Sequence, residues 1–578
     1  MKTLVALLAV FLSFVTHAQH SVLACKEALE NANYYKLQQE YHLALYYYQE
    51  VKACDANFAD IINKKIAEVF TILRQKRKEG IYPLGNKRFV LDYKDGKYGF
   101  IDHNNKVVLA YKYDEALPFN AKTHYAKVLK GKKQYWIDTL GKGLLLAEKL
   151  SELNPKTEVL DLTKNKLSYF PAEIFRCTKL KILLLSKNAI TEIPTAIDRL
   201  KQLEHLDLEG NRLKSIPGAI GSLRKLRFLN LARNQILELP SSFGNLTNLI
   251  HLELSASGLK ALPESFGNLA HLKTLNFQWN KLLVLPSSFG ELSSLQFLDL
   301  RGSELASLPE SFGELSQLTT LNLDWAEIKY VPKNIENIPQ LKQLDLSFKD
   351  LEELPYWIGY FIHLEELNLS HNRLSKIPDE IGTLKKLKTL DISSNQLYRL
   401  PANIVQLTAL ETLHMNNNQL SKLPLFFDNL ADLEDLNLGF NLFSQLPESI
   451  GNLANLAILD LRLNNLSSLP QSFKKLANLH TLRLENNKLS SIPKEIGKLK
   501  KLINLDLGYN ALKQLPESIG QLINLSNLNL NGNQLSTLPK SLPALATLRN
   551  LRLFNTAIPR ENRALIEAIL PQCSIAWE

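Results

Sequence analysis

Aromatic side chains recur in this 578-residue chain at one fixed place in a repeating pattern, one residue before a position that is usually asparagine. Exposed rings supply contact area at low entropic cost and are enriched at binding interfaces. This series therefore suggests recognition of a partner, and drift at an exposed position is the alternative explanation. Its members are Trp279, Trp325, Phe348, His371, Phe440 and Tyr509.

Known catalytic and nucleotide-binding motifs are absent from the sequence. The sequence contains no HExxH, GxSxG, GxxxxGK[ST] or strand-associated GxGxxG pattern. The 12 histidines are scattered. His205 and His251 share a strand position two turns apart, which places their backbones about 10 Å from each other, too far for an obvious shared metal. The sequence predicts no enzymatic activity, no cofactor and no metal site.

Acidic and amide residues alternate at a second fixed position, in the centre of each expected strand. Like charges on neighbouring strands destabilise a sheet, so an intervening amide separates them. A polar strip for a hydroxyl-rich or cationic ligand is the functional alternative. The series is Asp207, Asn230, Glu253, Asn276, Asp299, Asn322, Asp345, Asn368 and Asp391.

The elements that hold these residues repeat every 23 residues. From Asn165 to Thr556 the chain contains 18 turns without an insertion, and 13 of them carry asparagine at what we call the ladder position. A second series, from Pro171 to Pro539, places 17 of the 24 prolines at the same spacing. A fixed period of this length predicts a solenoid, in which each turn packs on its neighbours. The ladder positions without asparagine are Ser257, Ser303, Ala326, Lys349 and Thr556.

One turn reads as a strand followed by a return segment. In LKTLDISSNQL, which ends at Leu397, the piece TLDIS alternates as a half-buried strand does. The next residues place Pro401, Ile404 and Leu407 at three-residue spacing, which suits a short helical turn or an irregular return segment. We expect the ladder asparagine to satisfy buried backbone groups of adjacent turns, because an amide both donates and accepts.

The pattern LxxLxLxxNxL followed by LPxxIGxLxxL resembles the leucine-rich repeats of the typical 23-residue subclass, over about residues 150–560. The resemblance implies an α/β solenoid, a horseshoe with a parallel concave sheet. Members of the family mostly bind partners on that concave face. A small helical segment and a small β module are expected to precede the solenoid.

The first 18 residues resemble a secretory signal, with Lys2, an apolar run from Leu4 to Val15 and a cleavage site ending at Ala18. An uncleaved anchor is the alternative, and no later segment has a membrane-span pattern. Cys25 and Cys54 lie at opposite ends of two expected helices and could approach each other. In an oxidising compartment they either form a disulfide or remain free thiols. Cys177 replaces a core leucine and is expected to be buried; Cys573 has no evident partner.

The N-terminal part of the chain contains two further modules. Residues 19–80 read as a helical segment that resembles a tetratricopeptide-type pair, with a simple helical cap as the alternative. Residues 81–148 resemble WG-type β-repeats, although Tyr98 replaces the tryptophan of that family. Between residues 60 and 150 there are 19 basic and 10 acidic residues, a net charge of +9 within the +10 of the chain. This excess could attract acidic partners, but ordinary solubility explains it too.

We therefore expect an exported binding protein with five parts: a signal peptide (1–18), a helical segment (19–80), a WG-type module (81–148), the solenoid (149–560) and a C-terminal cap (561–578). Its partner is a protein or glycan, not nucleic acid. There are two alternatives. One is an adhesive or structural scaffold, and the other is an intracellular signalling scaffold if the signal segment is not used. The expected partner-binding residues are Trp279, Phe297, Arg301, Thr320, Asp324, Trp325 and Phe348.

Overall fold

The computed structural model describes residues 90–94, 97–101, 107–116, 126–130, 133–137, 142–328, 333–338 and 340–577. The expected signal peptide, the helical segment with its tetratricopeptide-like pair, and the Cys25–Cys54 pair lie outside these residues. The chain divides into two compact units, the first formed by residues up to 162 together with 172–184 and 202–205, and the second by the remainder.

The first unit contains the small β module. Strands β1 (Val90–Lys94), β2 (Lys97–Ile101) and β3 (Val107–Tyr113) form one antiparallel sheet, and β4 (Glu115–Ala116), β5 (Ala126–Lys130), β6 (Lys133–Ile137) and β7 (Gly143–Leu144) form another. Gly99 faces β3 so closely that a Cβ would lie 2.8 Å from the carbonyl oxygen of Leu109. Only glycine fits there, which explains the glycine beside the fully buried Tyr98.

Parallel strands begin within the same unit. Strand β8 (Leu146–Ala147) pairs in parallel with β9 (Val159–Asp161), and β9 with β10 (Ile182–Leu184). Two short 3₁₀ helices connect these strands: η2 (Leu150–Glu152) lies between β8 and β9, and η3 (Ala172–Arg176) lies between β9 and β10. Cys177 directly after η3 is buried, as the sequence predicts.

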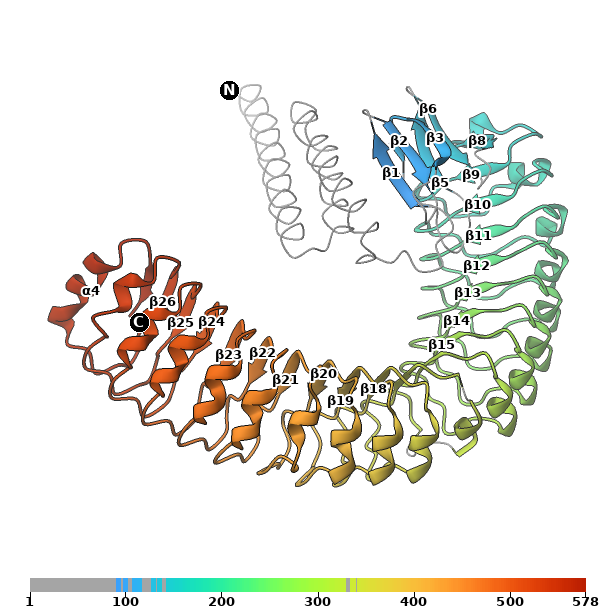
Figure 1. Ribbon diagram of the computed structural model, residues 1–578. Helices are drawn as coiled ribbons and strands as arrows, with labels where there is room; N and C mark the ends of the chain where they lie inside the picture. The colour runs from blue at the N-terminus through green and yellow to red at the C-terminus, as the bar shows by residue number, and fades with distance from the viewer. Residues whose placement is uncertain are drawn as a thin grey trace, which may run out of the picture. The chain divides into compact units, whose positions relative to one another are not determined.

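In the second unit, three-residue strands alternate with 3₁₀ helices, and every strand from β12 onward pairs in parallel with the next. The strands of the repeats lie along the inner side of this curved unit and the helices along its outer side (Figure 1). The strands are β11 (His205–Asp207), β12 (Phe228–Asn230), β13 (His251–Glu253), β14 (Thr274–Asn276), β15 (Phe297–Asp299), β16 (Thr320–Asn322), β17 (Gln343–Asp345), β18 (Glu366–Asn368), β19 (Thr389–Asp391), β20 (Thr412–His414), β21 (Asp435–Asn437), β22 (Ile458–Asp460), β23 (Thr481–Arg483), β24 (Asn504–Asp506), β25 (Asn527–Asn529) and β26 (Asn550–Arg552).

The return segments are 3₁₀ helices, one of the two forms that the three-residue spacing predicts. Pro401 precedes η13 with φ −65°, and its carbonyl accepts a hydrogen bond from the backbone N–H of Ile404. The return prolines therefore lie outside the strands, where the absence of an N–H costs nothing. The helices are η4 (Thr195–Arg199), η5 (Gly218–Ser222), η6 (Ser241–Asn245), η7 (Glu264–Asn268), η8 (Ser287–Glu291), η9 (Glu310–Glu314), η10 (Lys333–Asn337), η11 (Tyr356–Tyr360), η12 (Asp379–Thr383), η13 (Ala402–Gln406), η14 (Phe427–Asn429), η15 (Glu448–Asn452), η16 (Gln471–Lys475), η17 (Lys494–Lys498), η18 (Glu517–Gln521) and η19 (Leu542–Ala544).

Leucines fill the space between strands and helices, together with a row of stacked phenylalanines contributed by η6 to η9. Phe243, Phe266, Phe289 and Phe312 are completely buried, and their ring centroids lie 6.2, 6.3 and 6.0 Å apart. Beyond β26, the chain continues through η20 (Arg560–Asn562) and helix α4 (Arg563–Ile569) to β27 (Ser574–Ala576), which pairs with β26. These elements cover the last turn.

The ladder asparagines bind the backbone of adjacent turns. The amide nitrogen of Asn395 donates to the carbonyl oxygens of Leu369 (3.0 Å), Ile392 (3.2 Å) and Ser393 (3.1 Å), and its oxygen accepts from the N–H of Leu374 (3.0 Å). The same set of partners recurs at the other buried ladder asparagines, such as Asn372 and Asn441. The structural explanation of the ladder is confirmed.

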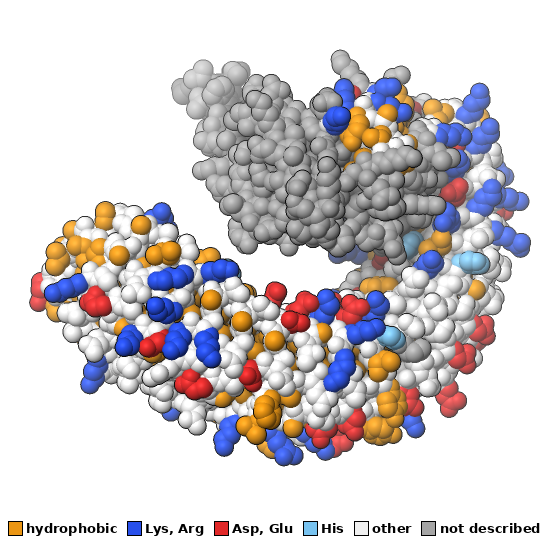
Figure 2. All heavy atoms as spheres, in the orientation of Figure 1, with side chains coloured by type: hydrophobic (Ala, Val, Ile, Leu, Met, Phe, Trp, Pro, Cys, Tyr) orange, Lys and Arg blue, Asp and Glu red, His pale blue; other side chains and the backbone are white. Residues whose placement is uncertain are grey.

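The visible surface carries charges of both signs, and Lys and Arg side chains gather over the C-terminal turns around β22 to β26 (Figure 2). Apolar side chains are mostly dispersed on it. Within the described ranges, no helix has the length and apolar character needed to cross a bilayer.

We expect Asn395→Ala to lower the free energy of unfolding by about 1–3 kcal/mol, because four buried hydrogen bonds lose their partner. Thr389→Ala in the strand of the same turn is the matched control, since its half-exposed side chain faces away from the core. Chemical denaturation of both variants measures the difference. Equal stability of the two would contradict the role of the ladder.

Candidate functional site

The predicted binding residues lie in turns six to nine, but only two of them are in strands. Phe297 begins β15 and Thr320 begins β16. Arg301 and Asp324 follow their strands by two residues, and the rings by three. Phe297, Arg301, Thr320 and Asp324 were expected at outward strand positions, and the rings at the strand ends. Arg301 and Asp324 instead lie beyond their strands, because the side chains of Asp299 and Asn322 accept hydrogen bonds from their N–H groups and turn the backbone there.

The rings occupy what we call the rim position, the residue before each ladder position. All 18 rim residues have positive φ, from 51° to 65°, whichever side chain they carry. Glycine at positions 210, 302 and 532, and asparagine at 417, 486 and 555, suit this left-handed conformation. A bulky ring does not, and it costs roughly 1–2 kcal/mol there. Trp279, Trp325 and Phe348 are nevertheless at this position and remain 54%, 52% and 36% exposed.

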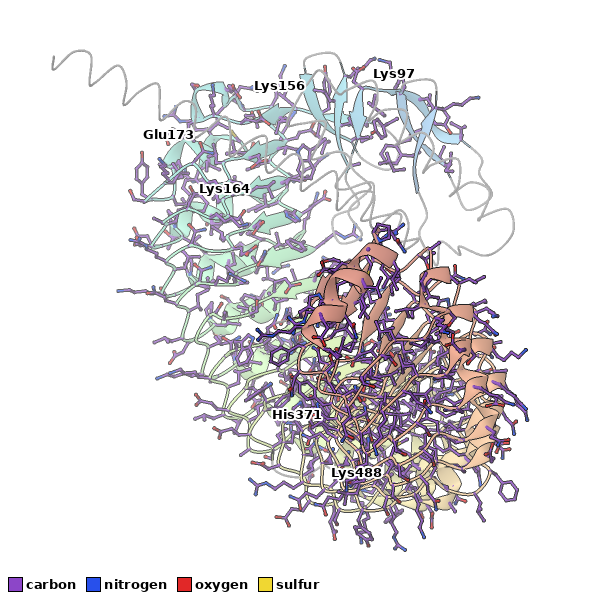
Figure 3. The ribbon with its side chains drawn as sticks, turned by 90° about the vertical axis from the view of Figure 1, so that its left-hand side faces the viewer. Lys97, Lys156, Lys164, Glu173, His371 and Lys488 are labelled. Carbon is purple, nitrogen blue, oxygen red and sulfur yellow. The ribbon has the colours of Figure 1, made fainter. Side chains whose placement is uncertain are left out.

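Three rim rings form a continuous stack across successive turns. The centroids of Trp325 and Phe348 lie 4.3 Å apart at an interplanar angle of 17°, and those of Phe348 and His371 lie 4.1 Å apart at 9°. Trp279 and Tyr509 lean toward the following turn. Trp279 lies over Gly302 in this way, at a place where a Cβ would come within 2.4 Å of its ring. Trp279, Gly302 and the stack therefore form an apolar stretch of rim positions over turns six to ten. His371, the last residue of this stretch, is labelled in Figure 3.

Charged side chains lie beside this rim. The Arg301 guanidinium is 3.5 Å from a carboxylate oxygen of Asp299 and 3.9 Å from one of Asp324. The Ser347 hydroxyl contacts both Asp324 (3.1 Å) and Asp345 (2.6 Å), which brings these two carboxylates close together. Burial raises the pKa of Asp324, and the negative charge of Asp345 raises it further. Thr320 contacts Gln343 instead, through a 2.9 Å hydrogen bond between their side chains.

The alternating acid and amide row has a structural explanation. In most of these turns the side-chain oxygen accepts a hydrogen bond from the N–H two residues later, as Asn322 does from Asp324 at 2.9 Å and Asp345 from Ser347 at 2.9 Å. Aspartate and asparagine serve equally well, and the amide can donate to the preceding carboxylate, as Asn368 does to Asp345 at 3.2 Å. The row ends each strand and keeps like charges apart.

Comparison with known families matches the leucine-rich repeat region to residues 150–260, 218–284, 263–357, 355–441 and 474–569, and the WG containing repeat to residues 98–133. The chain belongs to the leucine-rich-repeat family. The two N-terminal β sheets agree with the WG assignment. No curated protein matches the sequence.

Solved structures of leucine-rich-repeat proteins resemble this chain. A leucine-rich-repeat protein of Leptospira interrogans is 32% identical over 75% of this chain and 99% of its own, with a TM-score of 0.60. The ectodomain of the Arabidopsis receptor kinase HAESA, in complex with a peptide hormone, is 28% identical over 74% of this chain and 79% of its own, with a TM-score of 0.56. YopM of Yersinia enterocolitica is 28% identical over 69% and 79%, with a TM-score of 0.51.

Sequence reasoning did not find the left-handed rim or the stack. The glycines and asparagines that alternate with rings at the rim position were the available signal for positive φ. His371 was seen as part of the aromatic series but not as a site residue. In the part of the chain that the structure describes, no group of three His, Cys, Asp or Glu side chains could hold a metal ion.

Lys349 replaces the ladder asparagine directly beneath the rim of this leucine-rich-repeat solenoid. Its side chain is buried, and its ammonium donates to the carbonyl oxygen of Ala326 at 3.0 Å. Burial lowers the pKa of Lys349 from 10.5 to about 8, although the charges of Asp324 and Asp345 oppose this shift. A lysine has no acceptor atom, so it cannot bind the backbone N–H that an asparagine binds.

We expect Lys349→Asn to stabilise the protein at pH 7, by about 3 kcal/mol at most, because it removes a buried charge. The folded-state pKa of about 8 lies below the unfolded value of 10.5, so the unfolded state binds more protons between these values. The wild type therefore gains stability over that window, and the advantage of the variant shrinks.

Denaturation of both proteins at pH 7, 8, 9 and 10 measures this change. The exposed Lys376→Asn is the control, since it should show no such trend. A stability difference that stays constant with pH would contradict the burial of a titrating amine at this position.

Proposed function

We propose that this protein is an exported, non-enzymatic leucine-rich-repeat protein that binds a protein or peptide partner along the rim of its concave side. The observation that carries the proposal is the exposed stack of Trp325, Phe348 and His371, continued by Trp279 over Gly302. The partner would cover these rings, with Phe297, Arg301, Thr320 and Asp324 beside them.

The energetics of the rim support a binding role. Stacking contributes about 0.5–1.5 kcal/mol for each ring pair, which offsets the strain of the left-handed backbone only in part. Glycine would remove that strain, and it occupies the same position in three other turns. Half-exposed rings surrounded by polar groups also have the composition of a binding hot spot, in which a few aromatic anchors supply most of the affinity.

The solved relatives support a polypeptide partner. The HAESA ectodomain, which matches 74% of this chain, was solved with a peptide hormone bound. A plant peptide hormone receptor, 28% identical over 75% of this chain with a TM-score of 0.56, was solved in complex with RGF2. The absence of catalytic motifs from the sequence supports a role in binding rather than catalysis.

We expect the double variant Trp279→Gly/Trp325→Gly to weaken partner binding by about 2 kcal/mol or more, as loss of hot-spot rings does. Glycine removes the rings without adding strain, because Gly302 already adopts φ 62° at the rim position. The experiment is capture of partners from surface extract with the wild type, followed by titration of the captured partner against both proteins.

Ser394→Gly is the matched control. It makes the same backbone change at the rim position of turn 11, where φ is 53°, without removing a ring. Unchanged affinity in a double variant that melts as the wild type does would contradict the rim as the binding site. Retention of glycans without any protein would contradict a polypeptide partner.

Export is proposed from residues 1–18. We expect cleavage after Ala18, because a charged start, a short apolar run and a small residue precede it. N-terminal sequencing of the protein purified from its native source would begin at Gln19. A full-length protein that starts at Met1 in the cytosol would contradict export and favour an intracellular scaffold.

A further inference from the structure

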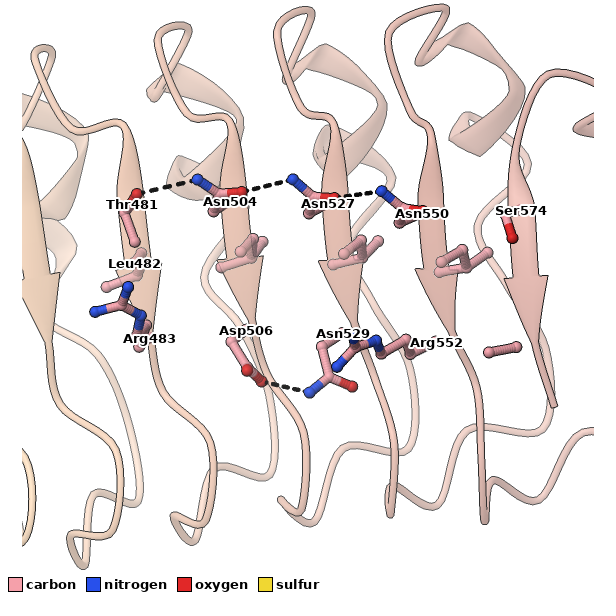
Figure 4. A pocket seen from close by; sticks show the side chains of 14 residues that line it. Thr481, Leu482, Arg483, Asn504, Asp506, Asn527, Asn529, Asn550, Arg552 and Ser574 are labelled. Atoms are coloured by element: carbon pink, nitrogen blue, oxygen red, sulfur yellow. Dashed lines mark hydrogen bonds between the residues drawn. The ribbon is translucent and has the colours of Figure 1, made fainter. Parts of the chain in front are cut away.

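The last strand of the parallel sheet, β27, pairs with a strand on one side only. Its partner is β26, and Ser574 of β27 lies beside Asn550 of β26 (Figure 4). Along the other edge of β27, no strand of the described residues is paired in register with it. An open strand edge presents backbone N–H and C=O groups, and it is a template for pairing with another chain.

The backbone of β27 divides its polar groups between these two edges. The Ser574 N–H donates to the carbonyl oxygen of Arg549 at 2.7 Å, and the Ala576 carbonyl oxygen accepts from the N–H of Leu553 at 2.8 Å. Residues 574 and 576 therefore direct their backbone groups toward β26. Successive residues of a strand direct these groups to opposite edges, so the N–H and the C=O of Ile575 both face the open edge.

The core side of this edge is incompletely covered. Ile575 occupies in β27 the position that Leu551 occupies in β26, but its side chain is partly exposed, whereas that of Leu551 is completely buried. An intact stack of turns covers this position with the next strand. The uncovered core residue and the unpaired backbone groups therefore belong to the same residue of β27.

Helix α4, which precedes β27, adds an exposed apolar face. The helix buries Ile566 and Leu570, yet Leu565 remains 64% exposed and Ile569 41%. Apolar side chains gather at this C-terminal end of the molecule (Figure 2). The exposed face has no charged residue and consists of Ala564, Leu565, Ala568 and Ile569.

Charges at this end are balanced and lie beside the apolar face. Elements η20 and α4 contain two arginines and two glutamates, so their net charge is zero. The Arg563 guanidinium lies over the Trp577 ring, 4.9 Å from its centroid, and the Trp577 Nε1–H donates to Glu567 at 2.9 Å. A surface without net charge does not repel an identical surface.

We infer that this end of the solenoid binds a second copy of the chain, with the two β27 strands antiparallel about a twofold axis at Ile575. In an antiparallel pair, opposite residues exchange both of their N–H···O bonds. Ile575 directs both groups to one edge, so it can pair with Ile575 of another copy. A twofold contact requires such a self-complementary patch, which a strand of different sequence does not supply.

The helices extend this contact. A twofold axis perpendicular to the sheet continues the sheet from one copy into the other and keeps both return layers on the same side. Each α4 then faces the α4 of the other copy, with Leu565 and Ile569 between them. Stable interfaces bury about 1,200 Å² or more in total, which two three-residue strands alone do not supply. This contact is separate from the aromatic rim, and neither proposal requires the other.

Sedimentation equilibrium of the full-length protein measures the association. We expect a monomer–dimer equilibrium, and Ile575→Pro should raise its dissociation constant about tenfold or more. Proline removes the outward N–H but leaves the hydrogen bonds of Ser574 and Ala576 with β26 intact. Ile575→Val is the matched control, since it keeps the N–H and should dimerise as the wild type does.

A second variant tests the helix face without changing the strand. Leu565→Glu/Ile569→Glu places charges on exposed positions of α4, so the monomer should fold and the dimer should weaken about tenfold or more. Ile523→Glu is the control, because Ile523 is similarly exposed but follows η18, outside the contact. Thermal melting checks that all variants are folded.

Cross-linking tests the register. In the antiparallel pair, residue 574 of one copy lies opposite residue 576 of the other, with Cα atoms about 4.5 Å apart, within the range of a disulfide. In a Cys573→Ser background, a mixture of Ser574→Cys and Ala576→Cys chains should therefore form disulfide-linked dimers on oxidation. Neither chain alone should do so, because identical positions are then two residues out of register.

Three outcomes would overturn the inference. A wild type that sediments as a monomer at every concentration would exclude the dimer. A dimer that survives both Ile575→Pro and Leu565→Glu/Ile569→Glu would place the contact elsewhere, and its loss in Trp279→Gly/Trp325→Gly would place it at the rim. Cross-linking of Ser574→Cys chains with one another would contradict the antiparallel register.

Discussion

The interaction on which the rest of this structure depends is the hydrogen bonding of the ladder asparagine. One side chain binds carbonyl oxygens in its own turn and in the preceding turn, and accepts an N–H from the preceding turn, as Asn395 does with Leu369, Ile392 and Leu374. These backbone groups are buried between stacked turns and water cannot reach them, so each would cost free energy if it were left unbound. The asparagine therefore fixes how one turn sits on the next.

The ladder also determines the geometry of the rim. To turn the asparagine inward, the chain reverses just before it, and the preceding residue adopts positive φ in all 18 turns. The rim side chains consequently share one direction and lean on the following turn, which is why Phe348 stacks between Trp325 and His371 and why Tyr509 lies over Gly532. The scaffold aligns any rings that the sequence places there. The ladder is irregular beneath the stack itself, where Ala326 and Lys349 replace asparagine, so the most aromatic section of the rim rests on the least regular part of the ladder.

The period of 23 residues was enough to predict the solenoid and its parallel strands, because both follow from which positions are apolar. For the return segments it left a short helical turn and an irregular segment as alternatives. The position of Cys177 in the core and the role of the asparagines followed from the same pattern. The left-handed backbone conformation of the rim residues could not be predicted from the apolar pattern. Trp279, Trp325 and Phe348 were placed at strand ends. In each of these turns the last strand residue accepts a hydrogen bond from the N–H two residues later, which ends the strand early, and the ring follows on a left-handed residue. Asn504, Asn527 and Asn550 follow the same 23-residue period, but only the structure shows their side chains hydrogen-bonded in a row.

The concave side of the second unit thus has two sets of exposed side chains on the same repeating backbone, one at the rim positions and one at the ends of the strands. At the rim, the side chain has no role in the backbone hydrogen bonding, so rings can replace glycine or asparagine at the cost of local strain alone. At the last residue of each strand, most Asp and Asn side chains accept a hydrogen bond from the N–H two residues later, as Asp506 and Asn529 do. Arg483 and Arg552 occupy the same strand position and carry positive charge there. Variation is therefore confined to positions that the turn does not need. In a solenoid whose core changes so little from turn to turn, differences at these positions are what can distinguish one section of the inner surface from another.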